Sequence, residues 1–524
     1  NSSLINAGVT LPSVLYDIDG NSRPQPQGSS YDIGADEYVG TVLPTNTPGP
    51  QANITVCQTG GCNFTTIQAA VNAAVPGSII EVYNGVYYES VTMNVSGAAS
   101  GWITLRARSG DAVWIDGSTA ITVTSNINLG SRSYWKIIGI KGRYAAKGSA
   151  LASYGAADGI TVGVGGHHIV IQDTEIKEPN ADGINLRGNN YEIQIINNEI
   201  YDMRKANPNW EGDGHAVHVT QVNVAASHDI LVKGNFVHDA HGKACLGLAD
   251  FSSLNAPHPT NIIFEYNKVQ DCTNGIKINA DGIFRYNLVV DTGKYTTGFE
   301  KPYSGFQAFT HDDANNVTNA EIYNNTVVGF DNSYGFMMTG SSRNQTIKIF
   351  QNNIAYNPKY YYVNSNMTNF TSPGYNLYYG KGNSAFVNFI SELTSIFADP
   401  QFNNAAANDY ALQSSTSPAK DKGVLVYTGQ PYSGTAPDIG AYEYQSGGSV
   451  TVTPSSTPSS PTRTPTPPSC PLKSSGDFNC DGKINESDLN SLLGKWMTDE
   501  NDITGDGKIN ESDLNKLLGN WKTL

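Results

Sequence analysis

A short pattern of apolar and polar positions recurs along the chain at irregular intervals. It follows the order apolar-x-apolar-x-x-Asn-x-apolar, and its asparagines are Asn198, Asn235, Asn267, Asn287, Asn325 and Asn352. The alternating apolar residues predict a short strand, and the asparagine predicts a bend that leads into another strand. Successive asparagines are 37, 32, 20, 38 and 27 residues apart. The shortest interval predicts one coil of a solenoid, and the longer ones predict insertions.

The constant phase of asparagine favours a parallel β-helix, because each asparagine would stack on those of neighbouring coils. The alternative, an antiparallel sandwich with asparagine-rich hairpins, does not require this phase. On these repeats the chain resembles right-handed parallel β-helix proteins of the pectate-lyase-like class over residues 53–444. Residues 64–93 are similar to the N-terminal coil of such proteins, where a short amphipathic helix, here Ile67 to Ala74, covers the open end. The resemblance implies an all-β solenoid.

A closing segment occurs twice in the chain. Residues 417–444 resemble the last segment of many secreted bacterial β-helix proteins, and residues 2–38 repeat it, with DIGA at 32–35 as at 438–441. We therefore interpret residues 1–40 as the cap of a preceding β-helix. Two explanations stay open: the sequence is part of a larger multidomain protein, or this cap docks on the β-helix of another molecule.

The composition of the chain indicates where linkers separate its domains and which classes of binding partner can be excluded. The segments 41–52 and 445–469 are rich in Pro, Thr and Ser, which predicts extended linkers. A net charge of −15 over 524 residues argues against nucleic acid or an anionic membrane as a partner. No apolar run approaches the ~20 residues that a membrane-spanning helix needs.

The six cysteines suggest a compartment outside the cytoplasm, because they are even in number and locally spaced. We favour the disulfides Cys57–Cys62 and Cys470–Cys480. For Cys245 and Cys272, a disulfide and two buried free thiols both stay open.

Two nearly identical loops near the C-terminus, DFNCDGKINESD (477–488) and DITGDGKINESD (502–513), predict calcium binding. An EF-hand-like loop supplies oxygen ligands at positions 1, 3, 5, 7, 9 and 12 and has Gly at position 6. The expected ligands are Asp477, Asn479, Asp481, the Lys483 carbonyl, Asn485, Asp488, Asp502, Thr504, Asp506, the Lys508 carbonyl, Asn510 and Asp513. We therefore expect two Ca²⁺ ions.

Each loop has Asp instead of Glu at position 12 and is followed by a single predicted helix. On these features residues 470–524 resemble the type I dockerin, although Thr504 departs from the usual Asn. The resemblance implies a small α-helical docking domain that binds a cohesin-like scaffold protein. Self-association and an intramolecular or purely structural role remain alternatives.

Ionisable residues are densest in the strands that open with ADGINLRG, GDGHAVHV, HGKACLGL and NGIKIN. They are Asp182, Arg187, Asp213, His215, His218, His241, Lys243 and Lys277. An inverting glycosidase would use two carboxylates, for which Asp182 and Asp213 are the candidates. A lyase would use a cation and a base, for which Lys243, Lys277, His215 and His241 are the candidates. Neither signature is complete, and a solvated turn is the commoner role for any one of these residues.

A second row of acidic residues follows the asparagine bends: Glu178, Asp202, Asp239, Asp271 and Asp291. Such a row is most often a solvated turn, but Ca²⁺ could bridge it.

These patterns together predict a secreted or cell-surface protein that recognises polysaccharide and acts as a glycosidase or a polysaccharide lyase. The rival interpretation is a non-catalytic surface or fibre-forming protein that assembles through its cap and its dockerin-like tail.

Overall fold

The computed structural model divides the chain into two compact units, Asn1–Ser456 and Thr457–Leu524. The residues that the structure describes all lie in the first unit: 53–119, 125–145, 157–203, 214–221, 226–240, 244–251, 258–272, 274–291, 303–310, 319–329, 333–340, 345–364, 368–380, 386–387, 392 and 394–445. The duplicated cap, both linkers and the calcium loops lie outside these residues. Asp213, His241 and Lys243 do so as well.

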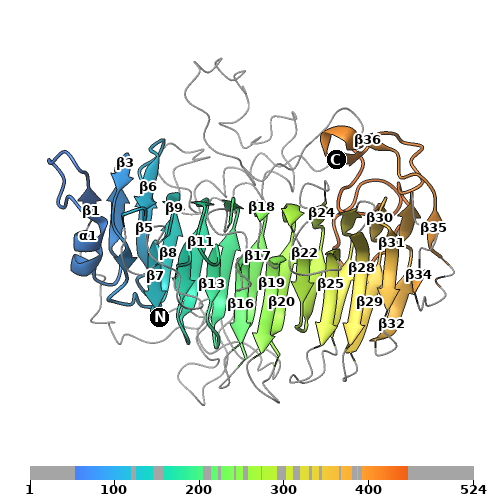
Figure 1. Cartoon of the computed structure of the whole chain (residues 1–524), viewed down its shortest axis with the longest axis horizontal. Helices are drawn as coiled ribbons and strands as arrows, with labels where there is room; N and C mark the ends of the chain where they lie inside the picture. The colour runs from blue at the N-terminus through green and yellow to red at the C-terminus, as the bar shows by residue number, and fades with distance from the viewer. Residues whose placement is uncertain are drawn as a thin grey trace, which may run out of the picture. The chain divides into compact units, whose positions relative to one another are not determined.

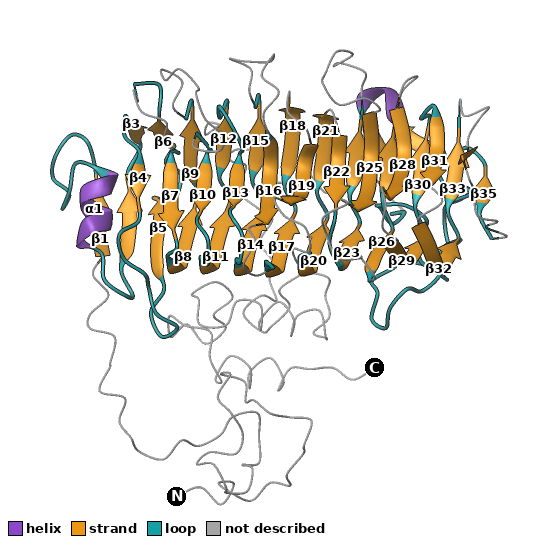
Figure 2. Ribbon diagram, turned by 60° about the horizontal axis from the view of Figure 1, so that its bottom comes forward, coloured by secondary structure: helices purple, strands orange, loops and turns teal. Residues whose placement is uncertain are grey.

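The described part of the first unit is a parallel β-helix with three long sheets (Figures 1 and 2). Sheet 1 has 12 strands in this part of the chain: β1 (Asn53–Val56), β2 (Ile79–Val82), β5 (Ile103–Ala107), β8 (Ser133–Ile138), β11 (His167–Gln172), β14 (Tyr191–Ile196), β17 (His228–Lys233), β20 (Thr260–Glu265), β23 (Gly282–Arg285), β26 (Ala320–Tyr323), β29 (Gln345–Gln351) and β32 (Thr368–Gly374).

Sheet 2 follows sheet 1 in each coil and also has 12 described strands. They are β3 (Gly85–Tyr87), β6 (Val113–Asp116), β9 (Ile140–Arg143), β12 (Glu175–Lys177), β15 (Glu199–Tyr201), β18 (Phe236–Ala240), β21 (Lys268–Cys272), β24 (Leu288–Val290), β27 (Thr326–Val328), β30 (Ile354–Tyr356), β33 (Leu377–Tyr379) and β35 (Ile396–Phe397).

Sheet 3 completes each coil with 11 described strands. They are β4 (Val91–Thr92), β7 (Ile127–Gly130), β10 (Ile160–Val162), β13 (Ile184–Leu186), β16 (His215–Gln221), β19 (Ala244–Phe251), β22 (Asn274–Ile278), β25 (Tyr303–Thr310), β28 (Ser333–Gly340), β31 (Tyr360–Asn364) and β34 (Phe386–Val387). After the coils, β36 (Phe402–Asn404) pairs antiparallel with β37 (Asp409–Leu412), and the short 3₁₀ helix η1 (Ala405–Ala407) connects them.

The predicted helix at the N-terminal end is confirmed as α1 (Ile67–Ala73). Thr66 caps it by accepting a hydrogen bond from Ala69 N, and the Glu89 carboxylate accepts from Ile67 N and Gln68 N. Its buried face packs on the first coil. No helix in the described part of the chain is long and apolar enough to cross a membrane.

The interior of the coil is a continuous apolar stack, because the same inward positions recur in each strand. Isoleucine and valine fill most of them, and the later coils stack Phe264, Phe284, Phe306, Phe336 and Phe350. A single coil cannot bury its apolar face, so stability comes from contacts between neighbouring coils.

The predicted asparagine ladder runs along the bend between sheets 1 and 2. The Oδ1 of each member accepts a hydrogen bond from the backbone N–H of the previous member, at 2.8–3.1 Å, through Asn198, Asn235, Asn267, Asn287, Asn325, Asn353 and Asn376. The residue before each of the seven has positive φ, as Tyr266 (57°) and Asn324 (52°) do. Asparagine and this left-handed residue together make the tight bend.

One member of the ladder was predicted wrongly. The ladder residue in IKIFQNNI is Asn353, and Asn352 is the left-handed residue before it. The register between β26 and β29 shifts by one residue, so Phe350 instead of Ile349 pairs with Ile322. This irregularity displaces the apolar pattern from its usual phase.

The closing segment docks on the coil through backbone groups. Asn352 donates to Val424 O and accepts from Val424 N, and Gly440 N donates to Asn352 O. Ile439 is fully buried. The position that breaks the ladder prediction therefore anchors the closing segment.

Two disulfides lie in the described residues. Cys57–Cys62 confirms the prediction, and Cys245–Cys272 resolves the pair that the sequence left open. Cys470 and Cys480 lie outside the described residues.

Candidate active site

Two columns of side chains lie on the side of sheet 3 that faces away from the core. Ile184 and Leu186 point into the core, so Asn185 between them points outward. Register across the parallel strands continues this outward row through Asn128, Thr161, Asn185, His218, Gly247, Lys277, Gln307 and Met337. The second column, at the start of the strands, contains Ser125, Asp158, Asp182 and His215.

Glycine places the two carboxylates of this column. The tetrapeptide Ala-Asp-Gly-Ile occurs at 157–160 and again at 181–184, and its isoleucines pair in register. A Cβ on Gly183 would lie 2.5 Å from Ala216 O and 2.6 Å from Ile200 Cγ2. Only glycine lets the chain pass this close to the core, with the carboxylate of the preceding aspartate turned outward.

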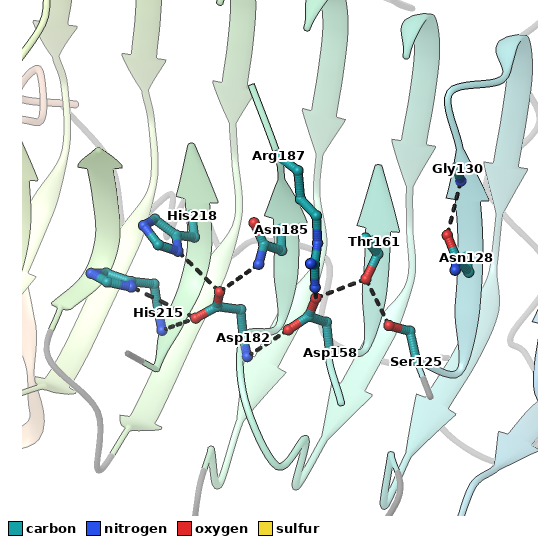
Figure 3. Close-up of polar contacts among 10 residues, drawn as sticks. All are labelled: Ser125, Asn128, Gly130, Asp158, Thr161, Asp182, Asn185, Arg187, His215 and His218. Atoms are coloured by element: carbon teal, nitrogen blue, oxygen red, sulfur yellow. Dashed lines mark hydrogen bonds and ion pairs between the residues drawn. The ribbon is translucent and has the colours of Figure 1, made fainter. Parts of the chain in front are cut away.

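Asp182 is the centre of a buried hydrogen-bond network (Figure 3). Its Oδ1 accepts from His215 N at 2.7 Å, and its Oδ2 accepts from Asn185 Nδ2 at 2.9 Å. His218 Nδ1 lies 3.0 Å from the same Oδ2. The two imidazole rings stack with their centroids 4.0 Å apart. Asp182, His215 and His218 are only 2–3% exposed, so their arrangement is fixed by packing.

Asp158 lies one coil before Asp182 and extends the network. Its Oδ1 accepts from Asp182 N at 3.2 Å, and its Oδ2 accepts from Thr161 Oγ1 at 2.7 Å and from Arg187 Nη2 at 3.2 Å. Thr161 and Ser125 share a further bond of 2.6 Å between their hydroxyls. The chain of contacts therefore runs from Ser125 to the histidines.

The two carboxyl groups have opposite pKa shifts. Burial raises the pKa of Asp158 to about 6, and the neighbouring Asp182 carboxylate adds to the rise, against the opposing effects of Arg187 and Thr161. Burial alone would raise the pKa of Asp182, but the nearby His218 and His215 hold it well below its usual range. Asp182 is therefore ionised, whereas Asp158 exchanges a proton in mildly acidic solution.

The Asp182 carboxylate and the two histidines also form a potential metal-binding group. Their ligand atoms all lie within 4.8 Å of one another. Two imidazole nitrogens and one carboxylate suit a transition metal rather than Ca²⁺, which prefers oxygen ligands. The contacts of Asp182 with His215 N, Asn185 and His218 already satisfy the carboxylate without an ion. The carboxylate therefore holds the His218 imidazole directly, and the His215 ring stacks on it.

The structure brings several of the predicted residues together. Asp182, Arg187, His215 and His218 belong to one network, and Lys277 lies in the outward row two strands beyond His218. Gly247 separates them, and a Cβ there would lie 2.2 Å from His215 Cδ2. Asp213, His241 and Lys243 lie outside the described residues.

The sequence analysis missed Asp158, Thr161, Asn185 and Ser125. The Ala-Asp-Gly-Ile copies at 157–160 and 181–184 were a partial signal, because a third copy at 280–283 leads into β23 of sheet 1. The predicted acidic row is a different feature. Glu178 and Asp202 directly follow sheet 2 strands, Asp239 and Asp271 lie near the ends of β18 and β21, and all four are left-handed, with φ of 48–54°.

Comparisons with known proteins show the fold. A family model for the right-handed beta helix region matches residues 125–327. A crystal structure of pectate lyase Pel9A is similar, with a TM-score of 0.50 and 15% identity, over 76% of this chain and 98% of that one. The described part of the first unit is therefore a right-handed parallel β-helix. No curated protein sequence matches it.

Weaker similarities include an adhesin. PfbA, a surface adhesin of Streptococcus pneumoniae, has a TM-score of 0.45 and 11% identity over 60% of this chain and 81% of that one. A rhamnogalacturonan lyase has a TM-score of 0.44 and 12% identity over 67% and 90%.

Proposed function

We propose that this chain is an extracellular polysaccharide lyase that cleaves uronate-containing chains on the outer face of sheet 3. One observation carries the proposal: Asp182 holds the His218 imidazole, with the His215 ring stacked on it, on the face where Lys277 also lies. A carboxylate-held imidazole is a general base, and a lysine in the same row supplies the positive charge that a uronate carboxylate needs. The substrate class also agrees with the similarity to pectate lyase Pel9A.

The reaction is an elimination. A histidine of the pair takes the proton from the carbon next to the uronate carboxyl group. The electrons of that C–H bond form a carbon–carbon double bond, the bond from the next ring carbon to the glycosidic oxygen breaks, and this oxygen leaves with a proton from solvent or from an acid group. Lys277 stabilises the negative charge that gathers on the carboxylate during proton removal.

Each residue of the network has a separate role in this proposal. Asp182 orients the imidazoles and stabilises the positive charge that the base acquires. His218 is the better-placed base, because its Nδ1 lies 3.0 Å from the carboxylate whereas His215 Nδ1 lies 3.6 Å away. Asp158 positions Asp182 by accepting a hydrogen bond from its backbone.

A glycosidase is the second candidate, supported by the different pKa values of Asp158 and Asp182. Carboxyl groups whose environments separate their pKa values are suited to acid and base roles. The lyase is favoured because both oxygens of Asp158 already accept hydrogen bonds within the protein.

The test is turnover of the full chain on a panel of uronate-containing and neutral polysaccharides. Ultraviolet absorbance of unsaturated products and new reducing ends are followed together. We expect both signals on a polyuronate, and we expect Asp182→Asn to lower kcat/KM by roughly 10²–10⁴-fold. Lys277→Met is expected to lower it on uronate substrates, with the exposed Asp173→Asn and Lys359→Met as matched controls.

The alternative outcomes are distinct. Reducing ends without unsaturated products would identify a glycosidase. Absence of turnover across the panel, with an intact fold, would favour a non-catalytic surface or fibre protein.

We also propose that residues 470–524 form a calcium-dependent docking module, which supports a secreted or cell-surface location. Titration calorimetry of the full chain is expected to show two Ca²⁺ sites. Asp488→Ala and Asp513→Ala should each remove one site, because each deletes the carboxylate at position 12 of one loop. A stoichiometry that neither variant changes would contradict the assignment. Capture of a cohesin module would identify a scaffold partner, and calcium-dependent dimerisation would identify self-association.

A further inference from the structure

A pocket of about 540 Å³ lies where the closing segment meets the corner between sheets 1 and 2. This volume falls in the roughly 300–1,000 Å³ range of small-molecule sites. Tyr266 and Tyr286 line it from the coil, and Tyr432, Tyr442 and Glu443 line it from the closing segment. The candidate active site is at a different part of the coil, where strands of sheet 3 begin.

The wall formed by the coil contains a pair of stacked tyrosine rings. Tyr266 and Tyr286 occupy the left-handed position before the ladder residues of successive coils, with φ of 57° and 56°. Their rings stack with centroids 4.9 Å apart and planes inclined by 10°. The ladder residues that follow them, Asn267 and Asn287, are buried and hydrogen-bonded, so they fix where the two rings stand.

The opposite wall combines aromatic and polar groups. Tyr432 is 46% exposed, although it is a large aromatic residue. The Glu443 carboxylate accepts hydrogen bonds from Ser433 N at 3.2 Å and from Asp438 N at 3.0 Å, which holds it against the pocket. Asn403 and Gln413 also line the space and supply amide donors and acceptors.

We infer that this pocket binds a neutral glycan, one or two sugar rings long, and is separate from the site on sheet 3. A sugar ring presents C–H groups on its faces, which pack on aromatic rings, and the exposed ring of Tyr432 offers this contact. Its hydroxyls match the amides and the carboxylate on the walls. No lysine or arginine is among the described lining residues, so none of these residues offers a positive charge to a uronate carboxylate.

The experiment measures binding by the full chain carrying Asp182→Asn, so that cleavage does not consume the ligand. Probes are neutral xylan, mannan, galactan and glucan oligosaccharides, with polygalacturonate oligosaccharides as the charged comparison, in titration calorimetry. We expect one neutral class to bind. Tyr432→Ala and Tyr266→Asn are each expected to raise its Kd roughly tenfold or more, as for central aromatic contacts.

The substitution at position 266 and the control variant are chosen so that a change in Kd reports on the pocket. Asparagine is used at position 266 because it tolerates positive φ better than alanine. The matched control is Tyr88→Ala, since Tyr88 is 61% exposed and lies outside the pocket, and it should leave Kd unchanged.

Absence of binding to all four neutral classes would overturn the inference. So would Kd values that neither pocket variant changes, or tighter binding of the charged oligosaccharides. Self-association that Tyr432→Ala abolishes, without any glycan binding, would instead make the pocket a contact between copies of this chain. Turnover on soluble polyuronate by chains with Asp182 intact should not respond to the pocket variants, so the two proposals can fail independently.

Discussion

The asparagine ladder and the column at the start of sheet 3 are both stacks of polar residues, but their compositions differ. The ladder repeats one residue through seven coils, from Asn198 to Asn376. The column changes from Ser125 to Asp158, Asp182 and His215. Each ladder asparagine satisfies the same backbone groups of its neighbours, and other residues, Thr174 and Ser395, take the equivalent position only at the two ends. Column residues use one oxygen for the backbone N–H of the next member, as Asp158 does for Asp182, but their other oxygen bonds to side chains outside the column, so their identities can differ.

The ladder is therefore a structural stack, which holds the fold, and the column is a chemical stack, whose residues could carry out a reaction. In the ladder every coil has the same backbone groups to satisfy, so the same residue type is repeated in each coil. Where carboxylates, imidazoles and a guanidinium meet over a few coils, the shared backbone geometry does not require those residue types. Burial strengthens the interactions within the column at the start of sheet 3, because charges and hydrogen bonds interact more strongly away from water.

The largest expected effect is on stability, from Asn267→Ala in the ladder. The change removes the acceptor of Asn235 N and Nδ2 and the donor to Val232 O, all of them buried. Each unpaired buried group costs about 1–3 kcal/mol, so we expect the free energy of unfolding to fall by roughly 3–5 kcal/mol. Urea unfolding followed by circular dichroism measures this loss.

The exposed Asn369→Ala is the matched control and should change stability by less than about 0.5 kcal/mol. Equal effects of the two substitutions would show that the ladder is not a structural requirement.

A smaller effect is expected from Gly247→Ala, which tests the chemical stack without changing a charged group. The new Cβ would lie 2.2 Å from Cδ2 and 2.8 Å from Nε2 of His215, so the ring must move. Displacement of a catalytic group by about 1 Å lowers kcat/KM by up to roughly 10²-fold. The rate is measured on the substrate that the panel identifies.

A double-mutant cycle with His215→Ala distinguishes displacement of the ring from general damage to the fold. In that background Gly247→Ala should have little further effect, because the clashing ring is absent. An undiminished loss in both backgrounds would contradict the role given to His215.

The smallest effect is the pH dependence of Asp158→Asn. In the folded protein Asp158 has a pKa of about 6, raised from its ordinary 3.8, so between these values it holds a proton that the unfolded chain has lost. Its contribution to stability is therefore greatest at low pH and is lost as the pH rises towards 6. Asparagine does not titrate.

We therefore expect the melting temperature of Asp158→Asn, relative to the unsubstituted protein, to rise between pH 4 and pH 7. The difference corresponds to on the order of 2 kcal/mol. Calorimetry across this range measures it, with Asp173→Asn as the exposed control. A difference that stays constant or falls with pH would show that the Asp158 pKa is not raised.

Local patterns predicted the coil well where the required contacts are local. The helix over Ile67–Ala73 and the Cys57–Cys62 disulfide are both short-range features, and both were predicted. The ladder was predicted until IKIFQNNI, where the register shift between β26 and β29 moved Asn353 into the place expected for Asn352. A register shift depends on the neighbouring strand, so the pattern of one segment does not reveal it.

The sequence predicted the region of the candidate site but not which of its side chains contact one another. Asp182, His215 and Lys277 were named for their density in the sequence, while Asp158 was overlooked although it contacts Asp182 directly. Intervals between coils vary with the insertions, so residue numbers alone do not say which side chains stack.

The sequence by itself determined the repeating coil, its apolar interior and its asparagine bends, because these depend on positions a few residues apart. The tertiary structure alone decided which of the ionisable residues meet, how deeply they are buried and how the closing segment completes the tyrosine pocket. Those outcomes depend on the register between coils and on exclusion of water, which arise only when distant segments pack together.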